Sequence, residues 1–517
     1  METRPSNKEC WLVYLFGTLA AFVIMRCGFS PSSMSMHLRP EYDLNIYYLI
    51  GQGWMQGRLP YVELSDLKGP LVFLLHGAGS LLTPGSFLGA CLLEAPLVGL
   101  GLLFAYRTAR LFVSQGAAFG VLGMYSVALL YFSLHPAEIT WVLQQMALFW
   151  LVRWAVEEEE PSAGVQFMLG FSVAVVLLTK YNQAVFWLPF CLWGVFAVGR
   201  DWWRAGFVQL LGSACLLGPV LWYFHAYDAL LPLWHEYVGI AWRYGSTSLS
   251  ESMLGTLGWL LASELVPLHL HQALPEWLAA CLGWLALLPC LLVPVFWRDR
   301  RAGLVYIVLL ASLMLSVYAA YCGTRRYIHY AFVFSVYLLP GLLLLAAWKE
   351  RLVKWGGAAV LVSVLAFAAG LPLAVQYLKP HNGNAEMKTV TQGLVRKLSQ
   401  GDKTDVVILD VEGALHLHRL TGTVPMRPHF IPTMVSGGYV QHREELSEAI
   451  RKRSPRYVVG SASNEEADKK LLRSTTERYR ELRHPELELP AFGAHARRPE
   501  YILYERESAL PPPKTTY

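Results

Sequence analysis

Residues Arg39–Pro70 read RPEYDLNIYYLIGQGWMQGRLPYVELSDLKGP and directly follow the first long apolar segment of the chain. The stretch contains four carboxylates, those of Glu41, Asp43, Glu63 and Asp66. Its other notable side chains are Arg58, Lys68, Tyr42, Tyr47, Tyr48 and Tyr61. Ionisable side chains are costly beside a hydrocarbon core and usually serve a function there. A loop so rich in acids and aromatics therefore predicts chemistry at a membrane surface.

The composition is that of a membrane protein. Of the 517 residues, 54% are hydrophobic and 16% are charged, and the mean hydropathy is +0.36. Soluble domains contain roughly 25% charged residues. The apolar residues fall in runs of about twenty, which is the length that crosses a hydrocarbon core. These values exclude an ordinary soluble protein and predict a polytopic α-helical membrane protein.

The eight cysteines lie in or beside apolar segments, and residues 379–517 contain none. This distribution is not a disulfide framework and has no metal-ligand spacing, so we interpret the cysteines as small buried apolar residues. The sequence also has no internal repeat and no GxGxxG, Walker or zinc motif.

We expect about eleven membrane spans. They cover residues 10–28, 88–107, 116–134, 138–154, 164–180, 184–199, 206–225, 275–297, 303–321, 328–347 and 356–377. The first has no small-residue cleavage site close behind it and is expected to be a retained anchor. Segment 71–83, LVFLLHGAGSLLT, is too short to span and is expected to be an interfacial or re-entrant helix.

The positions of lysine and arginine predict the orientation. With the N terminus in the cytoplasm, every cytoplasmic connection carries basic residues, namely Arg107 and Arg110, Arg153, Arg200 and Arg204, Arg298, Arg300 and Arg301, and Lys349, Arg351 and Lys354. The other side then collects the loop 29–87, residues 135–138 and 180–183, the loop 226–274, residues 323–329 and the C-terminal region. This convergence of polar residues predicts an active site on the extracytoplasmic face of the plasma (inner) membrane.

The composition changes near Lys379, so we divide the chain into a membrane module, 1–378, and a small extracytoplasmic α/β domain, 379–517. TDVVILDV, RYVVGS and YILYER are typical of short buried strands. EEADKKLLRSTTERYREL is typical of an exposed helix, and the alternation of strands and helices predicts an α/β fold.

The first loop also resembles that of a known family. An acidic pair, then YYLIGQGWMQGRLPY and DLKGPL, resembles the first extracytoplasmic loop of GT-C glycosyltransferases, which take a sugar from a polyprenyl-phosphate carrier. The resemblance is to bacterial members akin to protein O-mannosyltransferases and lipid A aminoarabinose transferases. It implies an inverting membrane glycosyltransferase of the cell envelope, with a glycan, lipid or protein as acceptor. We expect no nucleic-acid partner.

Such a transfer needs a base to align or deprotonate the acceptor, cations to hold the leaving phosphate, and a groove for the prenyl chain. The resemblance places the catalytic acid at Asp43, and Glu41, two residues away, is the alternative. Either acid could instead cap a helix or lie in solvent.

Two lysines are candidates for binding the donor phosphate. Lys68 follows Asp66 in DLKGPL, where Gly69 replaces the more usual proline of the family. Lys68 could neutralise the phosphate or pair with Asp66. Lys180, in LLTKYNQ, resembles a family element whose lysine contacts the donor phosphate, although a lysine at a helix C terminus is also favourable without any ligand.

The segment TRRYIHY supplies Arg325, Arg326 and His329 as further phosphate ligands, because the planar fork of arginine suits phosphate. Binding of anionic lipid headgroups is the alternative. Glu138 in HPAEIT, with Asp66 and Tyr61, is expected to position substrate or acceptor, although Glu138 could simply lie in the first turn of a helix.

No cofactor is certain from the sequence. It contains no strong metal-ligand set, although Asp43, Asp66 and Glu138 could converge on one divalent ion. We interpret His76, His135 and Glu94 as structural residues. The aromatic residues Trp234, Tyr237, Trp242 and Tyr244 are expected to be mostly interface anchors.

Two other classes of function stay open at this point. A transporter or flippase for lipid-linked sugars would have polar or broken helices near the bilayer midplane and often two related halves, neither of which the sequence suggests. A non-catalytic membrane scaffold would use the C-terminal region to bind a partner.

Overall fold

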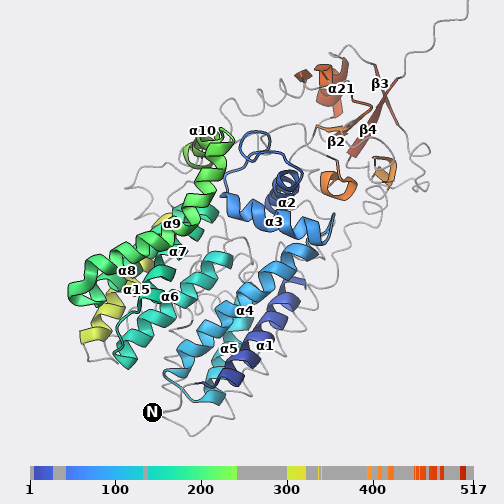
Figure 1. Ribbon diagram of the computed structural model, residues 1–517. Helices are drawn as coiled ribbons and strands as arrows, with labels where there is room; N and C mark the ends of the chain where they lie inside the picture. The colour runs from blue at the N-terminus through green and yellow to red at the C-terminus, as the bar shows by residue number, and fades with distance from the viewer. Residues whose placement is uncertain are drawn as a thin grey trace, which may run out of the picture. The chain divides into compact units, whose positions relative to one another are not determined.

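In a computed structural model, the structure describes residues 5–26, 42–131, 138–240, 300–321, 336, 339, 393–394, 396–398, 406–409, 417–423, 447–448, 450–452, 455–461, 465–473, 478–482 and 501–507 (Figure 1). The chain forms two compact units. The first comprises Met1–Ser35, Lys68–Leu75 and Ala90–Leu378, and the second comprises Met36–Leu67, His76–Gly89 and Lys379–Tyr517.

The helices, in chain order, are α1 (Asn7–Arg26), α2 (Tyr42–Met55), α3 (Pro70–Leu82), α4 (Leu88–Arg110), α5 (Gln115–Tyr131), α6 (Glu138–Glu157), α7 (Ala163–Lys180), η2 (Tyr181–Phe186), α8 (Trp187–Ala197), η3 (Gly199–Asp201), α9 (Trp202–Ala226), α10 (Leu230–Leu233), η4 (Trp234–Ile240), α15 (Arg300–Tyr321) and α21 (Glu465–Arg473). Within the described residues, four helical stretches are long and apolar enough to cross a membrane: Leu88–Arg110, Ile139–Glu157, Ala163–Ala197 and Gly199–Ala226.

Eight of the segments expected to span the membrane are helical, since they coincide with α1, α4 to α9 and α15 to within a few residues at each end. Segment 71–83 is the short helix α3. The other expected spans, 275–297, 328–347 and 356–377, lie outside the described residues except at Val336 and Leu339.

The stretch Ala163–Ala197 is a helical hairpin. α7 starts at Ser162, whose side chain accepts a hydrogen bond from the Val165 N–H as an N-cap. It ends at Lys180, whose φ of −154° and ψ of 85° leave the helical region. α8 then returns antiparallel, because Gln166 near the start of α7 donates a hydrogen bond of 2.6 Å to the Gly194 carbonyl near the end of α8.

Close packing joins α7 to α9. The Ser213 hydroxyl donates to the Gly170 carbonyl at 2.7 Å, and the Gln209 amide donates to Gln166 at 2.7 Å. A Cβ on Gly170 would lie only 1.8 Å from the Gln209 carbonyl oxygen. Small residues of this kind let membrane helices approach closely, and side-chain amides then hydrogen-bond across them.

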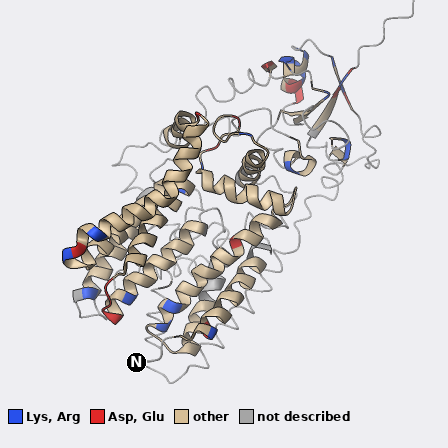
Figure 2. Cartoon of the chain, in the orientation of Figure 1, with Lys and Arg blue, Asp and Glu red and all other residues tan. Residues whose placement is uncertain are grey.

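Basic residues gather at one end of the first unit's helices (Figure 2). Arg107 near the end of α4 stacks on the Phe149 ring of α6 at 4.5 Å. Arg301 at the start of α15 donates to the Trp154 carbonyl near the end of α6 at 3.3 Å. Arg153, from the same end of α6, pairs with Glu157 at 2.6 Å. Membrane proteins concentrate such charges at their cytoplasmic side.

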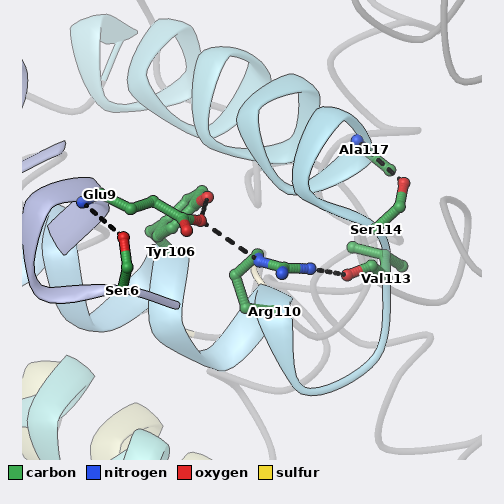
Figure 3. Close-up of polar contacts among 7 residues, drawn as sticks. All are labelled: Ser6, Glu9, Tyr106, Arg110, Val113, Ser114 and Ala117. Atoms are coloured by element: carbon green, nitrogen blue, oxygen red, sulfur yellow. Dashed lines mark hydrogen bonds and ion pairs between the residues drawn. The ribbon is translucent and has the colours of Figure 1, made fainter. Parts of the chain in front are cut away.

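A partly buried polar cluster holds α1 against α4 at this end (Figure 3). The Tyr106 hydroxyl donates to the Glu9 carboxylate, and Arg110 Nε lies 3.4 Å from the same oxygen. Arg110 also donates to the Val113 carbonyl at 2.9 Å, beyond the end of α4. The Glu9 carboxylate thus accepts the tyrosine hydroxyl and forms an ion pair with the guanidinium where α4 turns toward α5.

The C-terminal region contains a four-stranded sheet in the order β1-β2-β4-β3. Its strands are β1 (Val406–Ile408), β2 (Tyr457–Ser461), β3 (Tyr479–Glu481) and β4 (Tyr501–Arg506). β1 and β2 are parallel, whereas β4 is antiparallel to both β2 and β3. Apolar clusters cover both faces, since Val406 and Ile408 pack in one cluster and Val407 in the other.

The three strands expected in this region are confirmed as β1, β2 and β4. The expectation of one exposed helix over residues 465–482 was wrong in its second half. α21 ends at Arg473, and Tyr479–Glu481 pair with β4 instead. Pairing with an existing strand edge overrides local helix propensity there.

Candidate functional site

One backbone contact in the first unit brings two predicted site segments together. The Gly69 N–H, just before α3, donates a hydrogen bond of 3.0 Å to the Thr179 carbonyl near the end of α7. The approach is so close that a Cβ on Gly69 would lie 2.1 Å from the Leu178 carbonyl oxygen. Since Lys68 precedes Gly69 and Lys180 follows Thr179, the contact holds the backbones of both lysines at the same end of α7.

Tyr237 of η4 hydrogen-bonds to the backbone at the same end of α7. Its hydroxyl donates to the Leu177 carbonyl at 2.8 Å and accepts the Tyr181 N–H at 2.9 Å. The two rings meet edge to face with centroids 5.4 Å apart. The last four carbonyls of a helix lack partners inside it. Gly69 and Tyr237 therefore satisfy two of them in α7 and fix the chain on both sides of Lys180.

The Tyr237 hydroxyl lies within the electrostatic influence of Lys68. Burial raises the pKa of the Tyr237 hydroxyl, while the hydrogen bond from Tyr181 and the positive charge of Lys68 act in the opposite direction. Lys68 therefore lies close enough to influence a hydroxyl that touches the residue after Lys180. Tyr237 stays neutral at physiological pH, so its hydroxyl acts as a hydrogen-bonding group at this end of α7.

The start of α6 contacts the segment that follows α7. The Thr140 hydroxyl donates to the side-chain carbonyl of Gln183 at 2.9 Å, and both side chains are buried. Gln183 lies in η2, directly after α7. Glu138 is the first residue of α6, two positions before Thr140, so the backbone of this predicted residue belongs to the same end of the helices.

The second unit contains the rest of the predicted first loop. Asp43 lies in the first turn of α2, and its side chain is outside the described part of the structure. Asp66 and Tyr61 are buried. Tyr61 has a φ of 67° and donates its N–H to the Leu64 carbonyl at 2.8 Å. A left-handed backbone is unusual for a bulky residue and is retained where the surrounding structure enforces it.

The acid Glu63 of this loop has a local role. Its carboxylate accepts hydrogen bonds from Arg58 Nε at 3.2 Å and from the Leu59 N–H at 3.1 Å.

The side chain of His76 lies edge to face with the Tyr47 ring, with centroids 5.6 Å apart, and is buried. Glu94, in α4, is also buried.

Glu41, Arg325, Arg326 and His329 lie outside the described residues. Among the residues that the structure describes, no group of three His, Cys, Asp or Glu side chains could hold a metal ion. The side chains of Asp43 and Glu138 are not part of that set, and with Asp66 they are the three residues that, from the sequence, could converge on one divalent ion.

Sequence reasoning did not single out Tyr237. Trp234, three residues earlier, is 65% exposed as expected of an interface anchor, but Tyr237 is only 4% exposed. Tyr237 lies in a π-helical turn, a feature often found at functional sites. No local pattern in the sequence distinguishes it from its aromatic neighbours.

No protein-family model matches the sequence, and no curated protein matches it. Solved structures match almost its whole length. ArnT, an aminoarabinose transferase from Cupriavidus metallidurans, aligns in its apo state with a TM-score of 0.59 at 13% identity, over 96% of this chain and 98% of that chain. The structure of ArnT bound to undecaprenyl phosphate aligns over the same shares, with a TM-score of 0.56 at 14% identity.

The oligosaccharyltransferase of Archaeoglobus fulgidus in its apo form aligns with a TM-score of 0.52 at 13% identity, over 90% of this chain and 71% of that chain. All of these proteins are members of the GT-C superfamily. This chain has the GT-C fold. At this level of identity, the similarity shows the GT-C fold, and the roles of individual residues depend on the geometry of this chain.

Proposed function

We propose that this chain is an integral membrane glycosyltransferase that moves a sugar from a polyprenyl-phosphate carrier to an acceptor. The observation that supports this most strongly is the Gly69–Thr179 backbone hydrogen bond, which links the segments of Lys68 and Lys180 in a chain with the GT-C fold. Two cations held at one end of a membrane helix suit the phosphate of a lipid carrier. The bound undecaprenyl phosphate of ArnT is consistent with such a ligand.

The donor site in this proposal consists of the two lysines, with Arg325, Arg326 and His329 as further cationic ligands. Lys180 lies at the negative end of the α7 dipole, where a cation is favourable even before a ligand binds. Tyr237 holds the backbone around it. The lysines would neutralise the charge that grows on the phosphate as it leaves, which stabilises the transition state more than the ground state.

The transfer itself forms one bond and breaks one. The oxygen of the acceptor hydroxyl attacks the anomeric carbon, and the bond from that carbon to the phosphate oxygen breaks. Asp43, or Glu41 as the alternative, takes the hydroxyl proton, and polyprenyl phosphate leaves with the electron pair. Attack opposite the leaving group inverts the anomeric configuration. Asp66, Glu138 and Tyr61 are proposed to position the substrate or acceptor.

The proposed site faces the extracytoplasmic side of the plasma membrane, and the C-terminal α/β domain lies on that side as well. Support comes from the basic residues at the opposite end of the helices. The acceptor is a glycan, a lipid or a protein. A divalent ion bound by Asp43, Asp66 and Glu138 is a further hypothesis, which treatment with a chelator tests directly.

The test is release of polyprenyl phosphate from a panel of polyprenyl-phosphate sugars by the purified chain in nanodiscs, with and without a chelator. Asp43→Asn should abolish release while leaving donor binding intact. Lys68→Gln and Lys180→Gln should each weaken donor binding by about 10–100-fold, because a hydrogen bond to a charged group contributes about 1.5–3 kcal/mol. Lys452→Gln, which changes an exposed lysine that pairs with Glu448, is the matched control.

Each outcome has a distinct meaning. Native release by Asp43→Asn would move the base to Glu41 or to another group. Native donor binding by both lysine variants would refute the phosphate site. If the chain binds a donor, releases nothing and moves the lipid between leaflets of a vesicle, it is a flippase and not a transferase.

A further inference from the structure

Arg419, from the C-terminal region, is buried against the first-loop segments within the second unit. Its side chain is 1% exposed. Its Nε donates to the Asn45 side-chain oxygen in α2 at 2.9 Å, and an Nη donates to the Gly85 carbonyl at 2.6 Å. The guanidinium also lies over the Phe87 ring at 4.5 Å. A single side chain therefore contacts α2 and the segment between α3 and α4.

The segment around Arg419 is built to hold it. The Thr421 hydroxyl donates to the Leu417 carbonyl at 2.6 Å, and His418 Nδ1 lies 2.9 Å from the Thr423 hydroxyl. All of these side chains are buried. The short turn 417–423 thus satisfies its own polar groups and presents the guanidinium from a fixed backbone, which lowers the entropy cost of its contacts.

Gly85, which accepts a hydrogen bond from Arg419, is also held in place. The Gly85 N–H donates to the Tyr48 hydroxyl of α2 at 2.6 Å, so Gly85 connects α2 on one side and Arg419 on the other. Gly85 has a φ of 74°, which favours glycine. The Tyr48 and Phe87 rings meet edge to face at 5.7 Å. Burial lowers the pKa of Arg419 to about 10, so the guanidinium is still charged at neutral pH.

We propose that Arg419 is a positioning residue for the transfer reaction: it holds the first turns of α2, and thereby fixes the backbone of Asp43, two residues before its partner Asn45. This inference rests on the proposed function, in which Asp43 is the base. It gives the C-terminal region a defined part in catalysis, namely to hold the helix that carries the acid.

Arginine is required for this role because two acceptors and one ring must be contacted at once. The planar fork of the guanidinium can donate in two directions and stack on an aromatic face. Lysine keeps the charge but has no such fork, so Arg419→Lys should release at least one of the two acceptors. Asn45→Ala removes one acceptor from the other side of the same bond.

The experiment measures kcat, donor affinity and amide hydrogen exchange of α2 in full-length chains carrying Arg419→Lys, Asn45→Ala or both. Each single variant should lower kcat about tenfold and lower the exchange protection of α2 by a similar factor. Donor affinity should stay within about twofold, because the proposed phosphate ligands Lys68 and Lys180 belong to the other unit. The double variant should be no worse than the more severe single one, since both substitutions disrupt the same hydrogen bond between Arg419 and Asn45.

Arg451→Lys is the matched control, because this arginine is exposed and donates to the carbonyl of Ser447, four positions earlier in the chain. Native kcat and native α2 protection in Arg419→Lys would overturn the proposal. So would a loss of kcat that comes with an equal loss of donor affinity and of protection throughout the chain, which would indicate a general folding role.

Asp43→Asn and the exchange data separate this inference from the proposed function. If Asp43→Asn is inactive and Arg419→Lys is fully active, the proposed base stands and the positioning role is wrong. If no donor turns over in the native chain, the proposed function fails, and exchange of α2 still decides whether Arg419 holds that helix.

Discussion

Replacing Gly69 with alanine tests whether the contact between Gly69 and Thr179 holds the two lysines of the proposed donor site. The added Cβ would lie 2.1 Å from the Leu178 carbonyl oxygen and 2.3 Å from the Leu178 carbonyl carbon. Both atoms belong to the backbone of α7, so no side-chain rotation relieves the clash. The segment 68–70 must then move away from α7 by roughly 1 Å to restore an ordinary contact distance.

The expected cost has two parts. Overpacking of a tight contact costs about 1–3 kcal/mol. Weakening of the Gly69–Thr179 hydrogen bond adds about 1 kcal/mol. A total of about 2–4 kcal/mol should lower the apparent Tm of the detergent-solubilised chain by about 3–6 °C.

The displacement should also weaken phosphate binding. Moving one unit charge from 4 to 5 Å from another, at an effective dielectric constant near 20, loses about 0.8 kcal/mol, or roughly a fourfold change in Kd. Titration with undecaprenyl phosphate in nanodiscs measures this effect. Gly116→Ala is the control, because no described atom lies within 4 Å of the Cβ added there.

The outcome that refutes this reasoning is a Gly69→Ala chain that melts within 1 °C of the Gly116→Ala control and binds undecaprenyl phosphate equally well, about the resolution expected of such an assay. Gly69→Pro provides an independent check, since proline removes the N–H that Thr179 accepts.

Three further predictions concern other parts of the chain. Tyr237→Phe removes the hydroxyl that bonds two backbone groups at the end of α7, and should destabilise the chain by about 1–3 kcal/mol in thermal unfolding. It should not change the pH dependence of donor binding below pH 9, because the raised pKa of Tyr237 already keeps that hydroxyl neutral. Arg110→Met removes the guanidinium that pairs with the partly buried Glu9 carboxylate and should cost about 1.5–3 kcal/mol. Arg204→Met, at an exposed arginine, should cost less than about 0.5 kcal/mol, and equal losses would contradict this reasoning. Glu505→Gln should destabilise the C-terminal region at pH 7 and have little effect at pH 3. Burial raises the pKa of the Glu505 carboxyl, but hydrogen bonds from Arg480 and Arg456 outweigh burial and lower it below its usual value. The stabilisation is therefore present above the unfolded-state pKa and is lost as pH falls through the folded-state pKa, and a difference that persists at pH 3 would contradict this.

The sequence predicted the helices well, because long apolar runs have few alternatives to a helix. The resemblance to family motifs implied Lys68 and Lys180 as two of the ligands of the donor phosphate. The contact of Gly69 with Thr179 brings their backbone segments together, and their role stays a prediction. In the motif DLKGPL, Gly69 stands where the family more usually has proline. The structure supplies a physical reason, since neither a side chain nor a missing N–H would be tolerated there.

Other parts of the site could not be predicted, since they depend on contacts between distant segments. Arg419 lies in a stretch without a distinctive pattern, and its partners Asn45 and Gly85 are more than 300 positions away in the chain. Tyr237 differs from Trp234 only in burial, which depends on where α7 ends. β3 formed where helix propensity was high because the edge of β4 was available.

The hairpin of α7 and α8 has a consequence for how the chain enters a membrane. Lys180 is the only Asp, Glu, Lys or Arg between Glu160 and Arg200, and it lies where the hairpin reverses. When the two ends of the hairpin stay on the side of synthesis, the tip and this single ammonium group must be carried through the hydrocarbon core, where a lysine costs about 2.5–3.5 kcal/mol. Removing the charge should make insertion easier. A Lys180→Gln chain should therefore reach the membrane at least as efficiently as the native chain, so any loss of activity in that variant reports on the assembled protein and not on its biogenesis.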